Sequence, residues 1–165
     1  MIVRAAVPAD AQAIVDIINP IVRETTISFS TEEKTAEEFA TLIAGGRPVW
    51  VSEHEGRITG YATSFQFRNG PGYARTLEHS IALAPGGRGH GAGRALMAAL
   101  ESHAAANGAH SIFAGVSAEN PAGVAFHAAI GFREVARLPR VGWKFGRWLD
   151  LVLMQKFLSD PEQAG

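Results

Sequence analysis

The chain has 165 residues, of which 47% are hydrophobic and 19% are charged, and its formal net charge at pH 7 is −1. This length suits one domain with its own core, and the near-neutral charge argues against nucleic acid or an anionic membrane surface as a partner. The chain has no cysteine, which excludes disulfides, thiolate metal sites and a cysteine nucleophile. The N-terminus lacks the apolar core of a signal peptide, and no apolar run approaches about 18 residues. We therefore expect a cytoplasmic protein with one domain over residues 1–165, whose tail frays after about residue 158.

The spacing of apolar residues predicts alternating strands and helices. Helical spacing first appears at Ile14 and Ile17, and Pro20 is expected to break or bend that helix because it removes a backbone donor. Thr35 with Glu38 forms a capping box for the next helix. In chain order the predicted elements are a strand at 2–5, a helix from 7, a loop at 25–30, a helix from 35 to 45, strands at 49–54 and 58–67, a loop at 68–74, a strand at 76–83, a helix ending near 107, a strand at 111–116, a helix at 122–130, a strand from 132 and a strand at 148–156. Antiparallel strands followed by strand–helix–strand crossovers predict a mixed sheet in one α/β domain.

The glycine-dense stretch 87–94, which reads Gly-Arg-Gly-His-Gly-Ala-Gly-Arg, joins a predicted strand to a predicted helix. Glycine allows backbone amides to approach a ligand closely and to adopt positive φ. The start of the helix adds N–H groups without helical partners and a positive dipole end, which together favour an anion. Arg88 and Arg94 bring positive charge to the same place. The stretch therefore predicts a phosphate or pyrophosphate site.

The glycine spacing alone fits more than one ligand. A P-loop requires Gly-Lys followed by Ser or Thr, and the chain contains no such sequence. Gly87, Gly89 and Ala92 match the dinucleotide fingerprint, which also needs an acidic residue about 20 positions further on. The first acidic residue after the next predicted strand is Glu119, about 30 positions beyond Gly89. A nucleotide site and a glycine-rich turn without a ligand both remain open at this point.

A third pattern, Arg-x-x-Gly-x-Gly/Ala, is completed by Arg88, Gly91 and Gly93. The motifs around it are Thr76-Leu77-Glu78-His79-Ser80, Glu119-Asn120-Pro121, His127, Ile130-Gly131-Phe132 and Val141-Gly142-Trp143-Lys144-Phe145-Gly146-Arg147-Trp148-Leu149-Asp150. Together they resemble the GNAT superfamily of N-acetyltransferases, and within it the branch that contains phosphinothricin and methionine sulfoximine acetyltransferases. The resemblance extends from residue 76 to residue 155, and more loosely over the whole chain.

The resemblance implies a fold and a co-substrate. The fold is the single-domain GNAT fold, a mixed and mostly antiparallel sheet with helices on both faces, in which strands 76–83 and 111–116 form a parallel pair that splays to admit a pantetheine arm. The co-substrate is acetyl-coenzyme A, and no metal is expected. The residues expected to contact it are Ile81, Ala82, Leu83, Arg88, Gly89, His90, Gly91, Ala92, Gly93, Arg94 and Asn120.

Glu78 is the leading candidate for the catalytic base. Strand alternation places it on one face with Ser80 and Ala82, and places His79 on the other face among apolar residues. An acceptor amine with a pKa near 10 must lose a proton before it attacks a thioester, and the resembling enzymes carry a catalytic glutamate in this context. His79 is the rival base because the pKa of histidine suits proton transfer near neutrality. Its apolar neighbours favour a hydrogen-bonded core histidine instead.

Three residues that follow Glu78 in the chain bear on the coenzyme or the thioester. Asn120 precedes Pro121 at the start of a predicted helix and suits either a helix cap or a coenzyme contact. His127 stands where the branch carries histidine, which implies an acid that protonates the thiolate or a coenzyme contact. A histidine on the helix surface is the alternative. Ala82 departs from the branch, which usually has tyrosine there, so backbone N–H groups would have to stabilise the oxyanion.

The acceptor is expected to be a small amino-acid analogue of the methionine sulfoximine, methionine sulfone or phosphinothricin type. Besides Glu78, the expected acceptor contacts are Phe29, Arg68, His79 and Ser80, with Arg68 as a clamp for a carboxylate. The aromatic residues in 141–150 predict a buried dimer surface or a pocket wall, and a homodimer is expected. The leading hypothesis is an acetyl-coenzyme A-dependent N-acetyltransferase. The alternatives are a coenzyme A-binding sensor without turnover and a nucleotide-binding oxidoreductase.

Overall fold

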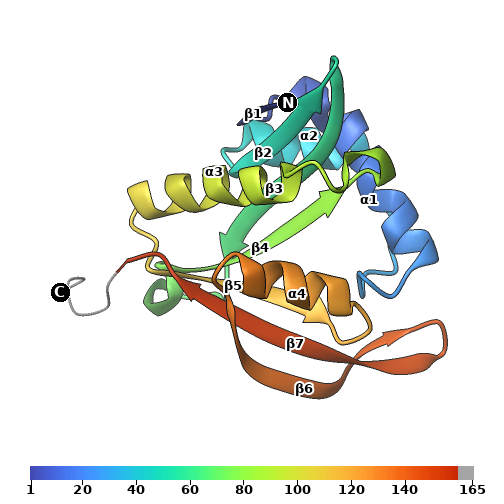
Figure 1. Ribbon diagram of the computed structural model, residues 1–165, viewed down its shortest axis with the longest axis vertical. Helices are drawn as coiled ribbons and strands as arrows, with labels where there is room; N and C mark the ends of the chain where they lie inside the picture. Colours follow the sequence, from blue (N-terminus) through green and yellow to red (C-terminus); the bar gives the residue numbers. More distant parts are fainter. Residues whose placement is uncertain (160–165) are drawn as a thin grey trace. The chain divides into compact units, whose positions relative to one another are not determined.

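The computed structural model describes residues 1–159, so most of the tail that is predicted to fray lies outside the described residues. Within them the chain forms two compact units. The first unit consists of residues 1–19, 34–65 and 79–108, and the second consists of residues 20–33, 66–78 and the chain from 109 onward. Figure 1 shows the elements along the chain. They are β1 (Ile2–Ala5), η1 (Pro8–Asp10), α1 (Ala11–Glu24), α2 (Ala36–Ala44), β2 (Val49–His54), β3 (Arg57–Gln66), η2 (Pro71–Tyr73), β4 (Thr76–Leu83), η3 (Pro85–Gly87), α3 (Ala92–Ala106), β5 (Ser111–Ser117), α4 (Pro121–Ala129), β6 (Arg133–Lys144) and β7 (Arg147–Phe157).

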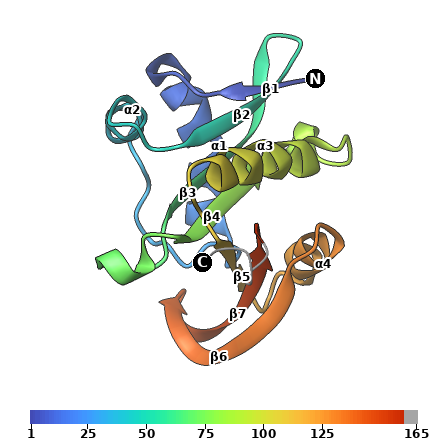
Figure 2. The ribbon, with the colours of Figure 1, turned by 90° about the vertical axis from the view of Figure 1, so that its left-hand side faces the viewer.

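The first unit is built on the strand order β1-β2-β3-β4. Val51 pairs with Tyr61 in the antiparallel β2–β3 ladder, and the edge of the Tyr61 ring meets Phe39 of α2. The neighbouring Gly60 points to the opposite face, where a Cβ atom would lie 3.1 Å from Leu96 of α3. Because successive residues of a strand face opposite sides, α2 and α3 cover opposite faces of these strands. Figure 2 shows α3 lying along the sheet.

The second unit has the strand order β4-β5-β7-β6, which β4 enters through residues 76–78. The Arg75 carbonyl accepts the N–H of His110 at 2.8 Å, which ties the starts of β4 and β5 together. β5 and β7 are antiparallel with Val116 opposite Val152, and α4 packs on the Val116 side, where its Gly123 closely approaches the Val116 side chain. The other face of β5 and β7 is therefore the face away from α4.

Most predicted boundaries agree with the structure to within one residue. The strands at 2–5 and 76–83 are confirmed without change, and the capping box is confirmed by hydrogen bonds of 3.1 Å in both directions between Thr35 and Glu38. The last strand extends one residue beyond its predicted bounds at each end, and β6 and β7 form a hairpin through Phe145 and Gly146, which both have positive φ. Across residues 1–159, no helix is long and apolar enough to cross a membrane.

Of the break or bend expected at Pro20, the break is wrong, because α1 continues through the proline to Glu24. Proline in a helix interior removes one backbone hydrogen bond and costs about 3 kcal/mol. Buried side chains on both sides of the proline, Ile14 and Ile18 before it and Val22 after it, offset that cost. Burying one such side chain stabilises a fold by about 1.5–3 kcal/mol.

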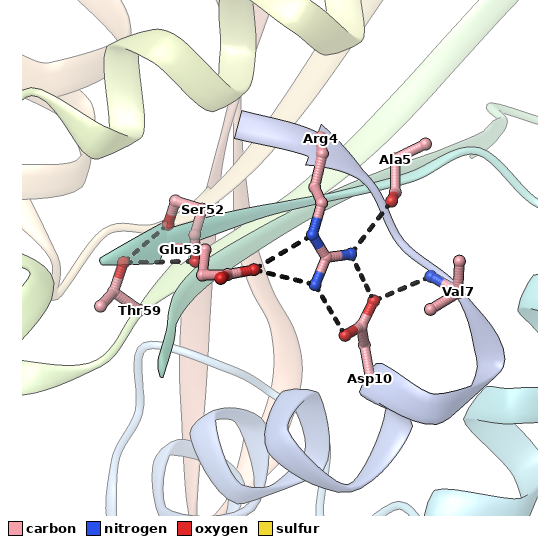
Figure 3. A network of polar contacts seen from close by, with 7 residues as sticks. All are labelled: Arg4, Ala5, Val7, Asp10, Ser52, Glu53 and Thr59. Atoms are coloured by element: carbon pink, nitrogen blue, oxygen red, sulfur yellow. Dashed lines mark hydrogen bonds and ion pairs between the residues drawn. The ribbon is translucent and has the colours of Figure 1, made fainter. Parts of the chain in front are cut away.

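Arg4 on β1 links the start of the chain to β2 in the first unit (Figure 3). Its guanidinium donates to both carboxylate oxygens of Asp10 at 2.8 and 3.0 Å and to Glu53 at 3.1 Å. The hydrogen bonds from Arg4 hold the pKa of the Asp10 carboxyl below its usual range, with burial opposing them and the Val7 N–H adding to them. The network fixes η1, and with it the start of α1, against the edge of the sheet.

Candidate active site

The glycine-dense loop forms an open backbone turn at the start of α3 in the first unit. Gly89 and Gly91 have φ of 81° and 77°, and no atom lies within 4 Å of the place where a Cβ would stand. Gly91 is the N-cap of α3 and provides no side chain to cap it. The N–H groups of the first helical turn thus lack both helical partners and a side-chain acceptor at the cap. Such a turn, with Arg88 and Arg94 exposed beside it, suits a phosphate group.

The loop is held in place by the neighbouring strand. A Cβ on Gly87 would lie 2.5 Å from the Thr59 carbonyl oxygen, so only glycine fits against β3 at this point. The same carbonyl accepts the Ala84 N–H at 2.8 Å, and the Ala84 carbonyl accepts the Gly87 N–H at 2.8 Å. The turn from β4 into α3 is therefore fixed at its base and open at its tip.

Glu78 lies in the second unit, on the face of β5 that points away from α4. Its Oε2 is 3.5 Å from where a Cβ on Gly115 would stand, and the side chain is half-buried. Burial raises the pKa of the Glu78 carboxyl above its ordinary value. Phe113, two residues before Gly115 on the same face, stacks on Phe67 with ring centroids 4.4 Å apart. The carboxyl thus lies over Gly115, two residues along β5 from a stacked aromatic pair.

Phe29 lies over the same sheet face as Glu78. Gly115 pairs with Leu153, which places Leu151 and Leu149 on this face by strand alternation. Gly142 pairs with Leu149, and a Cβ on Gly142 would lie 2.5 Å from the Phe29 ring. Same-face neighbours along a strand are about 7 Å apart. Glu78 and Phe29 therefore lie over one sheet face, separated by roughly one or two of the same-face side chains of β7.

Asn120 and His127 belong to α4. The Asn120 Oδ1 accepts the Gly123 N–H at 3.1 Å, which confirms that Asn120 caps the helix. His127 is buried, and its Nδ1 is 2.7 Å from the Gly123 carbonyl oxygen. Its ring makes T-shaped contacts with the rings of Phe126 and Phe132. A histidine on the helix surface is thereby excluded. Burial lowers the pKa of His127 below its ordinary value, although the Gly123 carbonyl acts in the opposite direction.

The remaining expected site residues differ in exposure. His79 is 5% exposed, which fits the core histidine that its apolar neighbours predict. Ser80, Ile81, Ala82 and Leu83 are partly exposed along β4, and the side chain of Arg68 is exposed in the loop after β3. In the second unit the structure brings Glu78 and Phe29 to one face. In the first unit it brings Arg88 and Arg94 to one turn.

Sequence reasoning missed the glycines that make this face. Gly115 and Gly142 both lie inside strands, and an isolated glycine in a strand often marks a close approach of another group. That signal was present at both positions. The partners, Glu78 at Gly115 and Phe29 at Gly142, were not predictable, because they come from segments distant in the chain.

Comparison with known proteins finds a family for this chain. The family described as acetyltransferase (GNAT) matches residues 14–132. An L-methionine sulfoximine/L-methionine sulfone acetyltransferase from Salmonella typhimurium is 38% identical over 97% of this chain and 96% of the relative. A phosphinothricin N-acetyltransferase from Streptomyces coelicolor is 36% identical over 93% of this chain and 94% of the relative.

The fold is also that of solved acetyltransferases. The structure of a putative acetyltransferase from Salmonella typhimurium, determined with its cofactor acetyl-CoA, superposes with a TM-score of 0.92 at 36% identity. The superposition covers 97% of this chain and 95% of that one. The α/β fold class expected from the sequence is thereby confirmed.

We predict that Glu78→Gln stabilises the fold at neutral pH. The folded state holds the pKa of this carboxyl above its ordinary value, so ionisation of Glu78 disfavours folding. The stability that the protonated carboxyl contributes is lost as pH rises through the raised pKa. The midpoint of urea unfolding should be higher for the variant than for the wild type at pH 7. The difference should disappear below the ordinary glutamate pKa of about 4.3. Exposed Glu32→Gln is the control, and an equal shift there would contradict the account.

Proposed function

The chain belongs to the GNAT family of acetyltransferases, and we propose that it transfers the acetyl group of acetyl-coenzyme A to the α-amino group of a small amino-acid analogue. The observation that carries the proposal is the position of Glu78. Its half-buried carboxyl stands over the face of β5 at Gly115. Glu78 lies on β4, three residues before Ile81, where the part of the strand that leads into the glycine turn begins. One strand thus connects a candidate base to a candidate phosphate site.

We propose that the turn 88–94 binds the pyrophosphate of acetyl-coenzyme A. The open φ-positive glycines and the first turn of α3 supply N–H donors, and Arg88 adds a charge that phosphate oxygens accept well. The partly exposed residues 81–83 are proposed to run beside the pantetheine, and Asn120 to contact the coenzyme with the part of its amide that does not cap α4. The structure of the Salmonella relative with acetyl-CoA supports this choice of co-substrate.

The proposed reaction is a direct transfer. Glu78 accepts one proton from the acceptor ammonium, and the amine nitrogen then attacks the thioester carbon to form the C–N bond. As the C–S bond breaks, the second nitrogen proton passes to the leaving sulfur, so the products are the amide, the coenzyme thiol and a protonated Glu78 that returns its proton to solvent. Backbone N–H groups of β4 around Ala82 stabilise the oxyanion, a contribution that is often the largest in acyl transfer. The thiolate has a pKa of about 8.5 and needs only a weak acid. His127, which is buried in α4, is kept as the candidate acid that passes a proton to the thiolate or as a coenzyme contact.

The proposed acceptor is an amino acid with a compact polar side chain, as in methionine sulfoximine, methionine sulfone or phosphinothricin. The names of two relatives, one for sulfoximine and sulfone and one for phosphinothricin, support this class. Phe29 would form one wall of the acceptor site, with Ser80 near the amine and Arg68 near the carboxylate. A sensor without turnover stays the second candidate, because Ala82 replaces the tyrosine that the branch usually carries. The family match leaves the oxidoreductase alternative without support.

We also propose a homodimer in which the tip of the β6–β7 hairpin meets a second copy. Trp143 and Trp148 are paired across the hairpin with ring centroids 5.0 Å apart, and both side chains are 55% exposed. Phe145 and Val141 are exposed beside them. Exposed aromatic clusters of this kind are typical of interface cores and unusual on a monomer. The cytoplasmic location stays a prediction.

Removal of the Arg88 charge should weaken coenzyme binding and leave the fold intact. Arg88 is exposed at the tip of the turn, so Arg88→Ala removes a phosphate contact and little packing. We expect the Kd for acetyl-coenzyme A to rise about tenfold, since hydrogen bonds to charged groups contribute about 1.5–3 kcal/mol. Calorimetric titration measures it, with exposed Arg57→Ala as the control. An unchanged Kd at low salt would place the pyrophosphate elsewhere.

Removal of the Glu78 carboxylate should slow turnover at neutral pH. Loss of a general base typically costs about 10²–10⁴-fold in rate, and Glu78→Gln keeps the shape of the side chain. The KM for acetyl-coenzyme A should stay within a factor of about two, because the carboxyl faces the acceptor. Initial rates of thiol release, with acetyl-coenzyme A varied at saturating acceptor, measure both kcat and this KM. Wild-type turnover in the variant would remove Glu78 from the mechanism.

The acceptor class is tested by thiol release across a panel of amines. We expect the highest kcat/KM for methionine sulfoximine or methionine sulfone, followed by phosphinothricin. Ordinary L-amino acids, a polyamine and an aryl amine complete the panel. A preference for the polyamine or the aryl amine would contradict the proposed acceptor. Coenzyme A binding without turnover on any amine would favour the sensor.

The oligomeric state is tested by sedimentation. The wild type is expected to sediment as a dimer of 17.5 kDa chains. Trp143→Ser with Trp148→Ser should shift the equilibrium to the monomer, because it removes two large apolar contacts. A monomeric wild type, or a variant that dimerises as the wild type does, would contradict the proposed surface.

A further inference from the structure

The loop at residues 25–30, which follows α1 in the second unit, is attached to the β6–β7 hairpin at three points. The first is an ammonium group. Lys144, the last residue of β6, is only 2% exposed, and its Nζ donates to the Ser28 carbonyl at 2.7 Å. Burial lowers the pKa of the Lys144 ammonium. Lysine is almost never buried to this extent unless a partner compensates the lost hydration, so this bond to the loop is a specific feature of the fold.

The second point is the contact of Phe29 with Gly142. A Cβ on Gly142 would lie 2.5, 2.8 and 2.9 Å from three carbon atoms of the Phe29 ring. The ring therefore occupies the place where any other residue would carry its side chain. Gly142 and Lys144 are two residues apart on β6 and face the same side, because strand residues alternate. Gly142 contacts Phe29 and Lys144 contacts Ser28, which are neighbouring residues of one loop.

The third point is a polar link at the start of the loop. The Thr26 hydroxyl donates to Glu119 Oε1 at 2.9 Å, and Arg147 of β7 donates to the same oxygen at 2.7 Å. Arg147 and Thr26 hold the pKa of the Glu119 carboxyl at about 2, so the link stays ionised at any pH near neutrality. An exposed pair of this kind adds little stability, but it fixes the direction in which the loop leaves α1.

An open cavity of about 300 Å³ lies beside Lys144, lined also by Val22, Arg23, Thr31, Glu33 and Phe145. The loop is held toward the hairpin by the Lys144 hydrogen bond, by the seat that Gly142 provides for Phe29 and by the polar link at Thr26.

We propose that Lys144 and Gly142 are positioning residues that set acceptor specificity by fixing Phe29 as a wall of the acceptor site. This inference rests on the proposed function, in which Phe29 contacts the acceptor. The β6–β7 and β5–β7 registers then fix the distance between that wall and Glu78, because Gly142, Leu149, Leu151 and Gly115 share one sheet face. The acceptor class it fits is an amino acid whose side chain packs on an aromatic ring.

The test is a double-mutant cycle on acceptor KM. Lys144→Met removes the ammonium group and keeps most of the aliphatic stem, Phe29→Ala removes the wall, and the third variant carries both changes. We expect each single change to raise acceptor KM by about tenfold or more, with kcat for the saturated enzyme and the KM for acetyl-coenzyme A unchanged. The double variant should be no worse than the worse single variant, because Lys144 acts through Phe29. Lys144→Arg, which keeps a donor, should restore most of the acceptor affinity.

Lys156→Met is the matched control. Lys156 on β7 also donates an ammonium hydrogen bond to a backbone carbonyl, that of Ile130 at 2.8 Å, but it is remote from the loop in the strand register. Its removal should lower the urea midpoint and leave acceptor KM unchanged. If Lys144→Met fails to fold, Gly142→Ala provides the same test, because the new Cβ displaces the Phe29 ring and leaves the ammonium in place.

The outcomes separate the inference from the function beneath it. Unchanged acceptor KM in both Lys144→Met and Gly142→Ala, with a raised value in Phe29→Ala, overturns the positioning role and keeps the acceptor site. Additive effects of Lys144→Met and Phe29→Ala overturn it as well. An unchanged value in Phe29→Ala overturns the wall itself and therefore the positioning role. A wild type that acetylates no amine overturns the proposed function.

Discussion

The absence of side chains at Gly115 and Gly142 is the constraint on which the candidate acceptor site depends. Each glycine lies inside a strand of the second unit and has a group from another segment close to the place where its Cβ would stand. At Gly142 that group is the ring of Phe29, in closer contact than any Cβ would allow. At Gly115 it is the carboxyl of Glu78, in ordinary van der Waals range. A loop residue and a residue of another strand thereby meet on a sheet face that the strand registers define.

The charged groups of the two candidate sites differ in their exposure to water. The turn before α3 gathers exposed positive charge and N–H donors that lack helical partners, which costs little because water solvates them until an anion binds. Glu78 is different, because its carboxyl is desolvated and its pKa is raised. A carboxyl with a raised pKa destabilises the folded state when it ionises, yet it is a stronger base than a solvated one. Stability is lost at the residue where the proposed chemistry takes place.

How much of this was predictable from sequence depended on the range of the interactions. The capping box at Thr35, the glycine turn and the alternation of β4 are local, so the sequence predicts them well. Pro20 was misjudged because the burial of Ile18 and Val22, which lie on either side of it, is a tertiary effect. The hydrogen bond from Lys144 to Ser28 joins residues 116 positions apart, and no spacing rule indicates it. The glycines in the strands did carry a signal, although their partners did not.

The central claim is that the Glu78 carboxylate removes the proton from the acceptor amine. The most direct test is the pH dependence of kcat/KM in the wild type and in Glu78→Gln, with methionine sulfone as the acceptor. The wild type should bind the ammonium form of the acceptor, so its kcat/KM should change little across neutral pH. Its kcat/KM should fall only when the pH decreases toward the raised pKa of the carboxyl. Without the carboxylate, only free amine reacts, so the variant should gain about tenfold per pH unit until the amine pKa. Parallel profiles in the two proteins would contradict the claim.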